Sequence, residues 1–172
     1  METIDNKIDE VKTGLALLPY FSQCFGRAFK FREKTSDKKT KISPAVILQG
    51  NDLNIVRPND KQSGVAFFYV KSPANYQNYT PASNNEMKFT VDLVMWFNST
   101  MIAGWEGLES ALQEIKALIS SYPAFSMVQI TYEAEQIYDG FTLEEVEKQY
   151  FCHPYYGSKI TFNVNFFENA CQ

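Results

Sequence analysis

The segment that decides the fold is residues 87–98, MKFTVDLVMWFN, which is the longest β pattern in the chain. One face of the expected strand is entirely apolar and consists of Phe89, Val91, Leu93, Met95 and Phe97. The opposite face is polar at its ends and apolar in the middle, and consists of Thr90, Asp92, Val94, Trp96 and Asn98. Because successive residues of a strand point to opposite faces, this pattern predicts a central strand that is covered on one side and partly covered on the other.

Two amphipathic helices are available to cover this strand. Their apolar residues recur at helical spacings of three and four: Ile4, Ile8, Val11, Leu15 and Leu18 in the first, and Trp105, Leu108, Leu112, Ile115 and Ile119 in the second. Thr3 is a suitable N-cap for the first helix, and Pro19 prevents its continuation because proline lacks the amide donor. We expect both helices to pack on a sheet.

Shorter apolar runs predict the remaining strands. They lie at residues 24–31, 44–49, 53–57, 64–71, 125–133 and 159–167, and turn residues separate them. Thr142 and Glu145 have the spacing of a capping box, which predicts a short helical turn over residues 146–149. The order of elements predicts an α+β fold, with a mainly antiparallel sheet and helices packed mainly on one face, in a single domain spanning residues 1–172.

Composition places the chain among ordinary globular proteins: 172 residues, 21% charged, with a formal net charge of −4. No segment approaches the run of about 20 apolar residues that crosses a bilayer. The first residues have neither the basic start nor the apolar stretch of a signal peptide. We therefore expect no membrane partner and a protein that stays in the cytoplasm where it is made.

Charge is divided unevenly along the chain, and this division suggests candidate contact residues. Residues 1–86 carry 12 basic and 9 acidic side chains, whereas residues 87–172 carry 4 and 11. A basic loop is expected at about residues 32–41, with Arg32, Lys34, Lys38, Lys39 and Lys41 as candidate partner-binding residues. An irregular loop is expected at about residues 72–86, where Tyr76 and Tyr79 among Asn and Ser offer an adaptable contact surface.

The residues that usually carry catalysis are sparse. Cys24, Cys152 and Cys171 form no metal or redox motif, and His153, the one histidine, precedes a proline in an expected turn. Glu133 and Glu135 would share a face of a strand, but a solvated edge explains them better than an acid and base pair. We expect no catalytic residue, no metal and no cofactor, and no sequence-specific binding of nucleic acid, since the chain is acidic and lacks a nucleic-acid motif.

The order of elements resembles that of the tail terminator, or tail completion, proteins of long-tailed phages. The resemblance rests on the N-terminal amphipathic helix, residues 43–48 (SPAVIL), the long strand at 88–97 (KFTVDLVMWF), the helix after Trp105 and the last strand at 160–166 (ITFNVNF). It covers nearly the whole chain. It implies a structural protein of a phage or prophage that performs no catalysis.

The resemblance further implies a homo-oligomeric ring, typically a hexamer, that caps the tail tube and joins it to the head connector. Such a protein assembles in the host cytoplasm and then becomes part of the virion. Two alternatives remain open: another neck or tail accessory subunit, and a small-molecule-binding α+β domain. The last would need a pocket lined by aromatic residues such as Phe67, Tyr69, Phe89 and Trp96.

Overall fold

The computed structural model describes residues 3–48, 52–71, 75–77, 85–142 and 152–168. Its main sheet has the strand order β1 (Gln23–Arg27), β5 (Gly64–Val70), β7 (Asn85–Asn98), β9 (Tyr155–Glu168) and β8 (Phe125–Thr131). A further short strand, β6 (Asn75–Gln77), pairs with the start of β7. Strand β1 runs parallel to β5, and the other pairs are antiparallel. The α+β class with a mainly antiparallel sheet is therefore confirmed.

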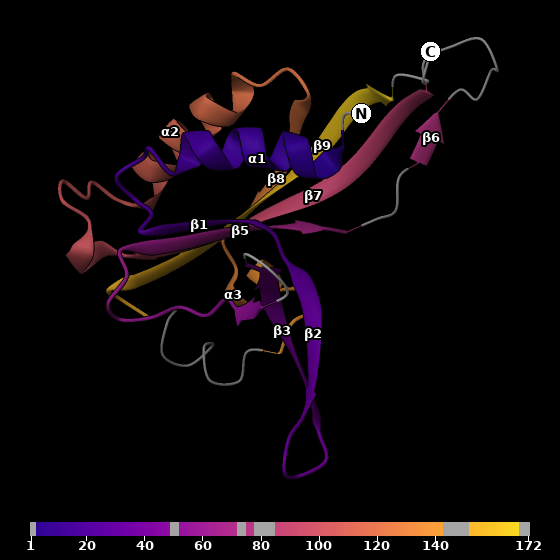
Figure 1. Cartoon of the computed structure of the whole chain (residues 1–172). Helices are drawn as coiled ribbons and strands as arrows, with labels where there is room; N and C mark the ends of the chain where they lie inside the picture. Colours follow the sequence, from indigo (N-terminus) through magenta and orange to yellow (C-terminus); the bar gives the residue numbers. More distant parts are fainter. Residues whose placement is uncertain (1–2, 49–51, 72–74, 78–84, 143–151, 169–172) are drawn as a thin grey trace.

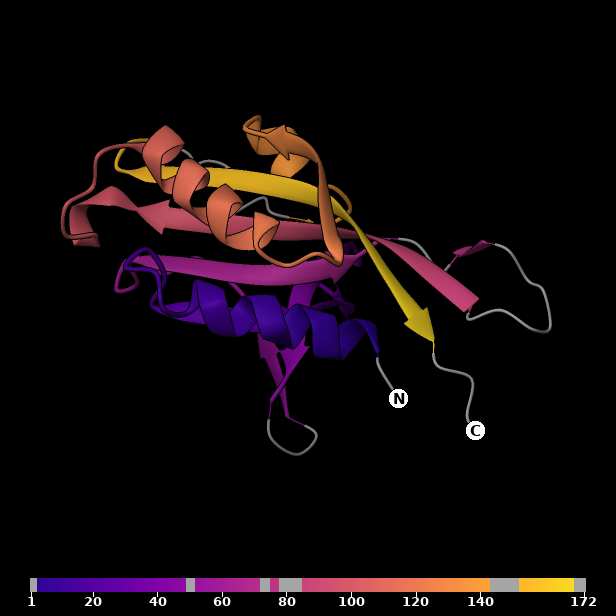
Figure 2. The same cartoon turned by 90° about the horizontal axis from the view of Figure 1, so that it is seen from above.

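The two long helices, α1 (Ile4–Leu15) and α2 (Leu108–Ser120), lie side by side on one face of the main sheet (Figures 1 and 2). Helix α1 begins where expected, because the Thr3 side chain accepts a hydrogen bond from the Asn6 amide at 3.2 Å. The predicted apolar stripes of both helices pack against the apolar face of β7. The residues that form this first core are Ile4, Ile8, Val11, Leu15, Leu112, Ile115, Ile119, Phe89, Val91, Leu93, Met95 and Phe97.

The opposite face of the sheet is covered by smaller elements. A second sheet has the order β2 (Phe29–Lys34), β3 (Thr40–Ile47) and β4 (Leu53–Ile55), and the short helix α3 (Ala134–Ile137) lies beside it. These elements bury a second, smaller core that contains Ala28, Val46, Val56, Val65, Phe67, Val94, Trp96, Ile137 and Tyr138. The partial cover predicted for the Val94 and Trp96 face of β7 is confirmed. A short 3-10 turn, η1 (Ser99–Met101), follows β7.

At Gly64, the first residue of β5, the backbone lies very close to the backbone of two neighbouring segments. A Cβ atom built on Gly64 would lie 2.4 Å from the Tyr20 carbonyl oxygen and 2.9 Å from the Trp96 carbonyl oxygen. The Gly64 carbonyl also accepts hydrogen bonds from the amide and the hydroxyl of Ser22, both at 3.0 Å. The missing side chain thus lets the segment after α1 close onto the end of the sheet.

Three sequence predictions require correction. The basic segment is a β-hairpin and not a loop, because β2 and β3 pair from Phe29↔Ala45 to Lys34↔Thr40. Residues 75–77 of the expected irregular loop form β6. The strand predicted at residues 125–133 ends at Thr131 and is interrupted by a register shift between Met127 and Gln129, where Val128 is 57% exposed although Ile130 is half-buried.

The helical turn predicted at residues 146–149 lies outside the described residues. His153 lies in the predicted turn before β9 and is joined to Pro154 by a cis peptide bond.

Candidate interaction surfaces

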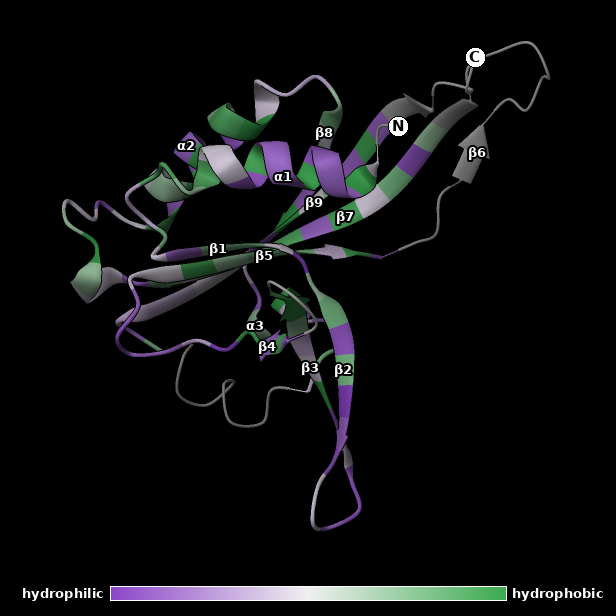
Figure 3. Cartoon of the chain, in the orientation of Figure 1, coloured by the Kyte–Doolittle hydropathy of each residue, from purple (hydrophilic) through white to green (hydrophobic). Residues whose placement is uncertain are grey.

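The hairpin of β2 and β3 projects away from the main sheet, on the side opposite the long helices (Figure 1). Its polarity increases toward the tip, where hydrophilic residues predominate (Figure 3). The turn at its tip is closed by the Thr35 amide, which donates to the Lys39 carbonyl at 2.9 Å, and by Lys38, which has a φ of 64°. Because neither face of the hairpin tip packs on a core, its strands are held mainly by the backbone ladder.

The structure brings the five predicted basic residues together on this hairpin. Arg32 and Lys34 lie on β2, Lys41 lies on β3, and Lys38 and Lys39 lie in the turn. All of them are exposed except Lys41, which is half-buried. Lys39 forms an exposed ion pair with Asp37 at 3.6 Å. The hairpin therefore presents a basic surface to solvent, named the basic hairpin below.

The two predicted tyrosines do not join the basic hairpin. Tyr76 lies on β6, which pairs with the far end of β7 next to the C-terminal end of β9 (Figure 1). Tyr79 lies outside the described residues. The predicted partner residues thus belong to at least two separate places on the fold, which sequence spacing could not distinguish.

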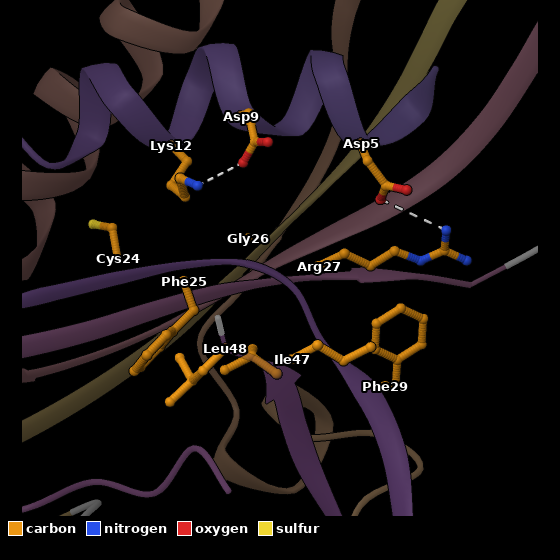
Figure 4. A pocket seen from close by; sticks show the side chains of 11 residues that line it. Asp5, Asp9, Lys12, Cys24, Phe25, Gly26, Arg27, Phe29, Ile47 and Leu48 are labelled. Atoms are coloured by element: carbon orange, nitrogen blue, oxygen red, sulfur yellow. Dashed lines mark hydrogen bonds and ion pairs between the residues drawn. The ribbon is translucent and has the colours of Figure 1, made fainter. Parts of the chain in front are cut away.

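A groove runs along the free edge of β1 and was not predicted from the sequence. It has a volume of about 480 Å³. Figure 4 shows β1 as its floor, α1 on one side, and the end of β3 with Phe29 on the other. The α1 side carries Asp5, Asp9 and Lys12, while the opposite side is apolar and carries Phe29, Ile47 and Leu48.

Charges within this groove are already paired at its helical side. Asp5 lies 3.7 Å from Arg27, and Asp9 lies 2.5 Å from Lys12. The Arg27 guanidinium also stacks over the Phe29 ring, 5.1 Å from its centroid. Burial raises the pKa of the Cys24 thiol to about 12, although Lys12 acts in the opposite direction. Cys24 is therefore a protonated, poorly reactive thiol at neutral pH.

A buried ion cluster lies on the hairpin side of the main sheet, where the polar face of β7 begins. Asp92 accepts a hydrogen bond from the Thr161 hydroxyl at 2.7 Å. Its other oxygen lies 2.9 Å from the ammonium of Lys71 and 3.9 Å from that of Lys159. Lys159 also donates to the Gln136 carbonyl of α3. Desolvation lowers the pKa of Lys159, and the nearby carboxylate of Asp92 only partly opposes that shift.

This cluster has a structural explanation. Asp92 and Lys159 are 3% and 5% exposed, and each is satisfied by the other elements of the fold. Through Lys159, the cluster connects β7 and β9 to α3. We interpret the cluster as a polar contact that stabilises the packing of α3 on the sheet.

The four aromatic residues named for a small-molecule pocket, and the two carboxylates Glu133 and Glu135, do not lie where those interpretations need them. Phe89 belongs to the core beneath the long helices, whereas Phe67 and Trp96 belong to the core on the opposite face, so they cannot line one pocket. Glu133 and Glu135 do not share a strand, because β8 ends at Thr131 and these residues begin α3. Within the described residues, no group of three or more His, Cys, Asp or Glu side chains is arranged to hold a metal ion.

No helix in the described parts of the chain has the length and apolarity that crossing a membrane requires. A scan of the chain against models of known protein families gives no match, and a search of curated proteins gives none either.

Proposed function

We propose that this chain is a structural phage protein whose copies form a ring at the end of the tail tube and join it to the head connector. The observation that carries the proposal is the basic hairpin. It extends from the sheet on the side away from the long helices, where it is free to contact a second protein. The remaining support is the order α1, long strand β7, α2 and last strand β9, because the resemblance to tail terminator proteins rests on this order.

The distribution of charge supports a contact between unlike surfaces. Residues 23–41 carry seven basic and two acidic side chains, and residues 125–140 carry three acidic and no basic ones. Unlike charges on two parts of one subunit favour a head-to-tail contact between copies, which yields a closed ring when the rotation between subunits closes. The basic hairpin contributes to that contact or to the contact with tube and connector.

The mass of the protein in solution tests ring formation. Light scattering after size exclusion, at low and at high salt, is expected to give a closed-ring multiple of the 19.7 kDa subunit, such as a hexamer. The variant Lys38→Glu with Lys39→Glu reverses two charges of the basic hairpin and is expected to weaken assembly at low salt, where charges are screened least. Lys61→Glu with Lys116→Glu is the matched control, because neither residue lies on the hairpin.

Assembly that is unchanged by the hairpin variant at low salt would contradict a role of the hairpin in ring formation. Binding to tail tubes tests the second part of the proposal. Genes for tail-tube and connector proteins are expected beside the gene for this chain. Tubes purified from that phage should sediment with the wild-type protein, and failure to do so would refute the tail assignment.

A further inference from the structure

We propose that a polar pocket between α3 and the main sheet binds a small zwitterionic molecule. The carboxylate of the ligand lies against Lys71 and Lys159, and its ammonium group lies against Glu135 and Asp139, which line the same pocket. The pocket has a volume of about 390 Å³, which is a usual size for a small-molecule site. Binding of such a ligand is independent of the proposed assembly, since it uses neither the basic hairpin nor a second copy of the chain.

The floor of the pocket is polar because neighbouring strands place polar side chains on one face of the sheet. Lys159 of β9 lies opposite Thr131 of β8, and Thr161 of β9 lies opposite both Gln129 of β8 and Asp92 of β7. Paired residues share a face, as do residues two apart in a strand, so these five side chains form one patch. Four of them are at most 9% exposed: Asp92, Thr131, Lys159 and Thr161. A covered sheet face is normally apolar, so a buried polar patch beside a cavity points to a polar ligand.

Lys159 has hydrogen-bonding capacity left for that ligand. Its ammonium carries three N–H donors, and its contacts inside the fold use one of them, which bonds to the Gln136 carbonyl. The Oδ2 atom of Asp92 lies 3.9 Å away, which is too far for a hydrogen bond. Two donors therefore have no acceptor among the described residues, although the Lys159 side chain is only 6% exposed. A ligand carboxylate supplies both the acceptors and the opposite charge.

Lys71 adds a second positive charge at the same place. Its ammonium lies 2.9 Å from Asp92 Oδ2, and its side chain is 33% exposed where it lines the pocket. Two ammonium groups thus share the single carboxylate of Asp92. Burial, and to a smaller extent the charge of Lys71, lowers the pKa of Lys159, although Asp92 opposes both effects. A second carboxylate, brought by the ligand, balances the excess positive charge.

The outer side of the pocket is acidic and selects a ligand that also carries an ammonium group. Glu135 lies on α3 and Asp139 lies just after it, and both side chains are exposed. A ligand with a carboxylate alone is repelled by these two negative charges, whereas an added ammonium group is attracted to them. Because water screens exposed charges, this outer pair contributes less to affinity than the buried lysine and mainly provides selectivity.

NMR titration of the ¹⁵N-labelled protein tests the pocket with matched probes. Glycine, β-alanine and 4-aminobutyrate carry both charged groups at increasing separation, and acetate, propionate and butyrate are the corresponding acids without the ammonium group. We expect at least one of the three zwitterions to bind with a Kd of about 1 mM or lower, and at least about threefold more tightly than its acid. Shifts of backbone amides should concentrate at Thr131, Lys159 and α3, which surround the pocket.

Two substitutions remove the positive charges one at a time. Lys71→Met changes a partly exposed residue, and Lys159→Met replaces a buried one by an unbranched apolar side chain. Each is expected to weaken binding of the best zwitterion at least about tenfold, because each removes a charge-assisted hydrogen bond to the carboxylate. Lys61→Met is the matched control, since Lys61 is exposed and does not line the pocket. The amide spectrum of each variant verifies that the fold is intact.

Glu135→Gln tests the acidic side of the pocket separately. The variant removes one negative charge from an exposed position and should keep the fold. It is expected to weaken binding of the zwitterion about two- to fivefold and to leave binding of the matched acid equal or tighter, because the removed charge attracts the ammonium group and repels the carboxylate.

Three results would overturn the proposal. The first is that none of the three zwitterions binds with a Kd below about 10 mM. The second is that the shifted amides lie away from the pocket. The third is that folded Lys71→Met binds the best zwitterion as tightly as the wild type, a result that can be obtained even where Lys159→Met does not fold. An acid that binds as tightly as its zwitterion would overturn the role of Glu135 and Asp139, and with it a zwitterionic ligand. The mass in solution tests the ring independently of all these results.

Discussion

Replacement of Asp92 by Asn tests whether the buried ion cluster stabilises the sheet. The change keeps the shape of the side chain and an acceptor for the Thr161 hydroxyl, but it removes the negative charge beside Lys159, which is 5% exposed. Removal of one partner from a buried pair costs about 3–5 kcal/mol, because the other charge stays buried and uncompensated. The Asp92→Asn change also breaks the ion pair with Lys71. Because the Lys71 side chain is 33% exposed, water can solvate its charge, and the loss of this pair adds at most about 1 kcal/mol to the destabilisation.

Urea unfolding measures this loss. With a slope of about 2 kcal/mol per M, a loss of about 4 kcal/mol lowers the midpoint by about 2 M. The control Asp9→Asn removes the exposed pair with Lys12 and is expected to cost less than about 1 kcal/mol. In Asp92→Asn combined with Lys159→Met, the cost should fall below that of Asp92→Asn alone, because no buried charge remains unpaired. A midpoint shift below about 0.5 M for Asp92→Asn would refute the reasoning.

The same ion cluster determines whether folding stability rises or falls with pH. The pKa of Lys159 is lower in the folded protein than its ordinary value of 10.5, because burial disfavours the charged ammonium. Between the two pKa values the unfolded chain binds more protons than the folded one, so this residue makes stability rise with pH in that window. Loss of Asp92 removes a negative charge that favours the ammonium. The rise should therefore begin at lower pH in Asp92→Asn.

Three further predictions concern single residues. Gly64→Ala is expected to destabilise the fold by about 2 kcal/mol or more in urea unfolding, because its Cβ atom would collide with two carbonyl oxygens. The control Gly26→Ala should change stability by less than about 1 kcal/mol, since the closest contact of its Cβ atom would be 3.5 Å. The Cys24 thiol, with its pKa of about 12, should react with iodoacetamide at pH 8 at least about 10² times more slowly than the exposed Cys152. Peptide mass spectrometry follows both reactions, and equal rates would contradict the burial of Cys24. Burial and the nearby Glu114 raise the pKa of Tyr20 to about 12, so its contribution to stability is present below pH 10 and is lost as the pH rises from about 10 to 12. The variant Tyr20→Phe should therefore lose less stability at alkaline pH. A pH profile of unfolding identical to that of the wild type would argue against this role of Tyr20.

The sequence by itself determined the elements whose side chains divide into a buried and an exposed face. The alternation in residues 87–98 located β7 and assigned its apolar face to the core beneath the helices. The spacing of three and four in residues 4–18 and 105–119 located both long helices. These patterns are visible because burial constrains residue type at every turn of a helix or every second position of a strand.

Tertiary structure alone decided the features that leave no such pattern. The basic hairpin is polar on both faces near its tip, so its strands have no periodicity, and backbone pairing makes it a hairpin. The ion cluster joins Lys71, Asp92 and Lys159, which are far apart in sequence and meet because three neighbouring strands place them together. The β1 groove depends on which strands end at the sheet edge, and strand order is set by long-range pairing that local residue patterns do not encode.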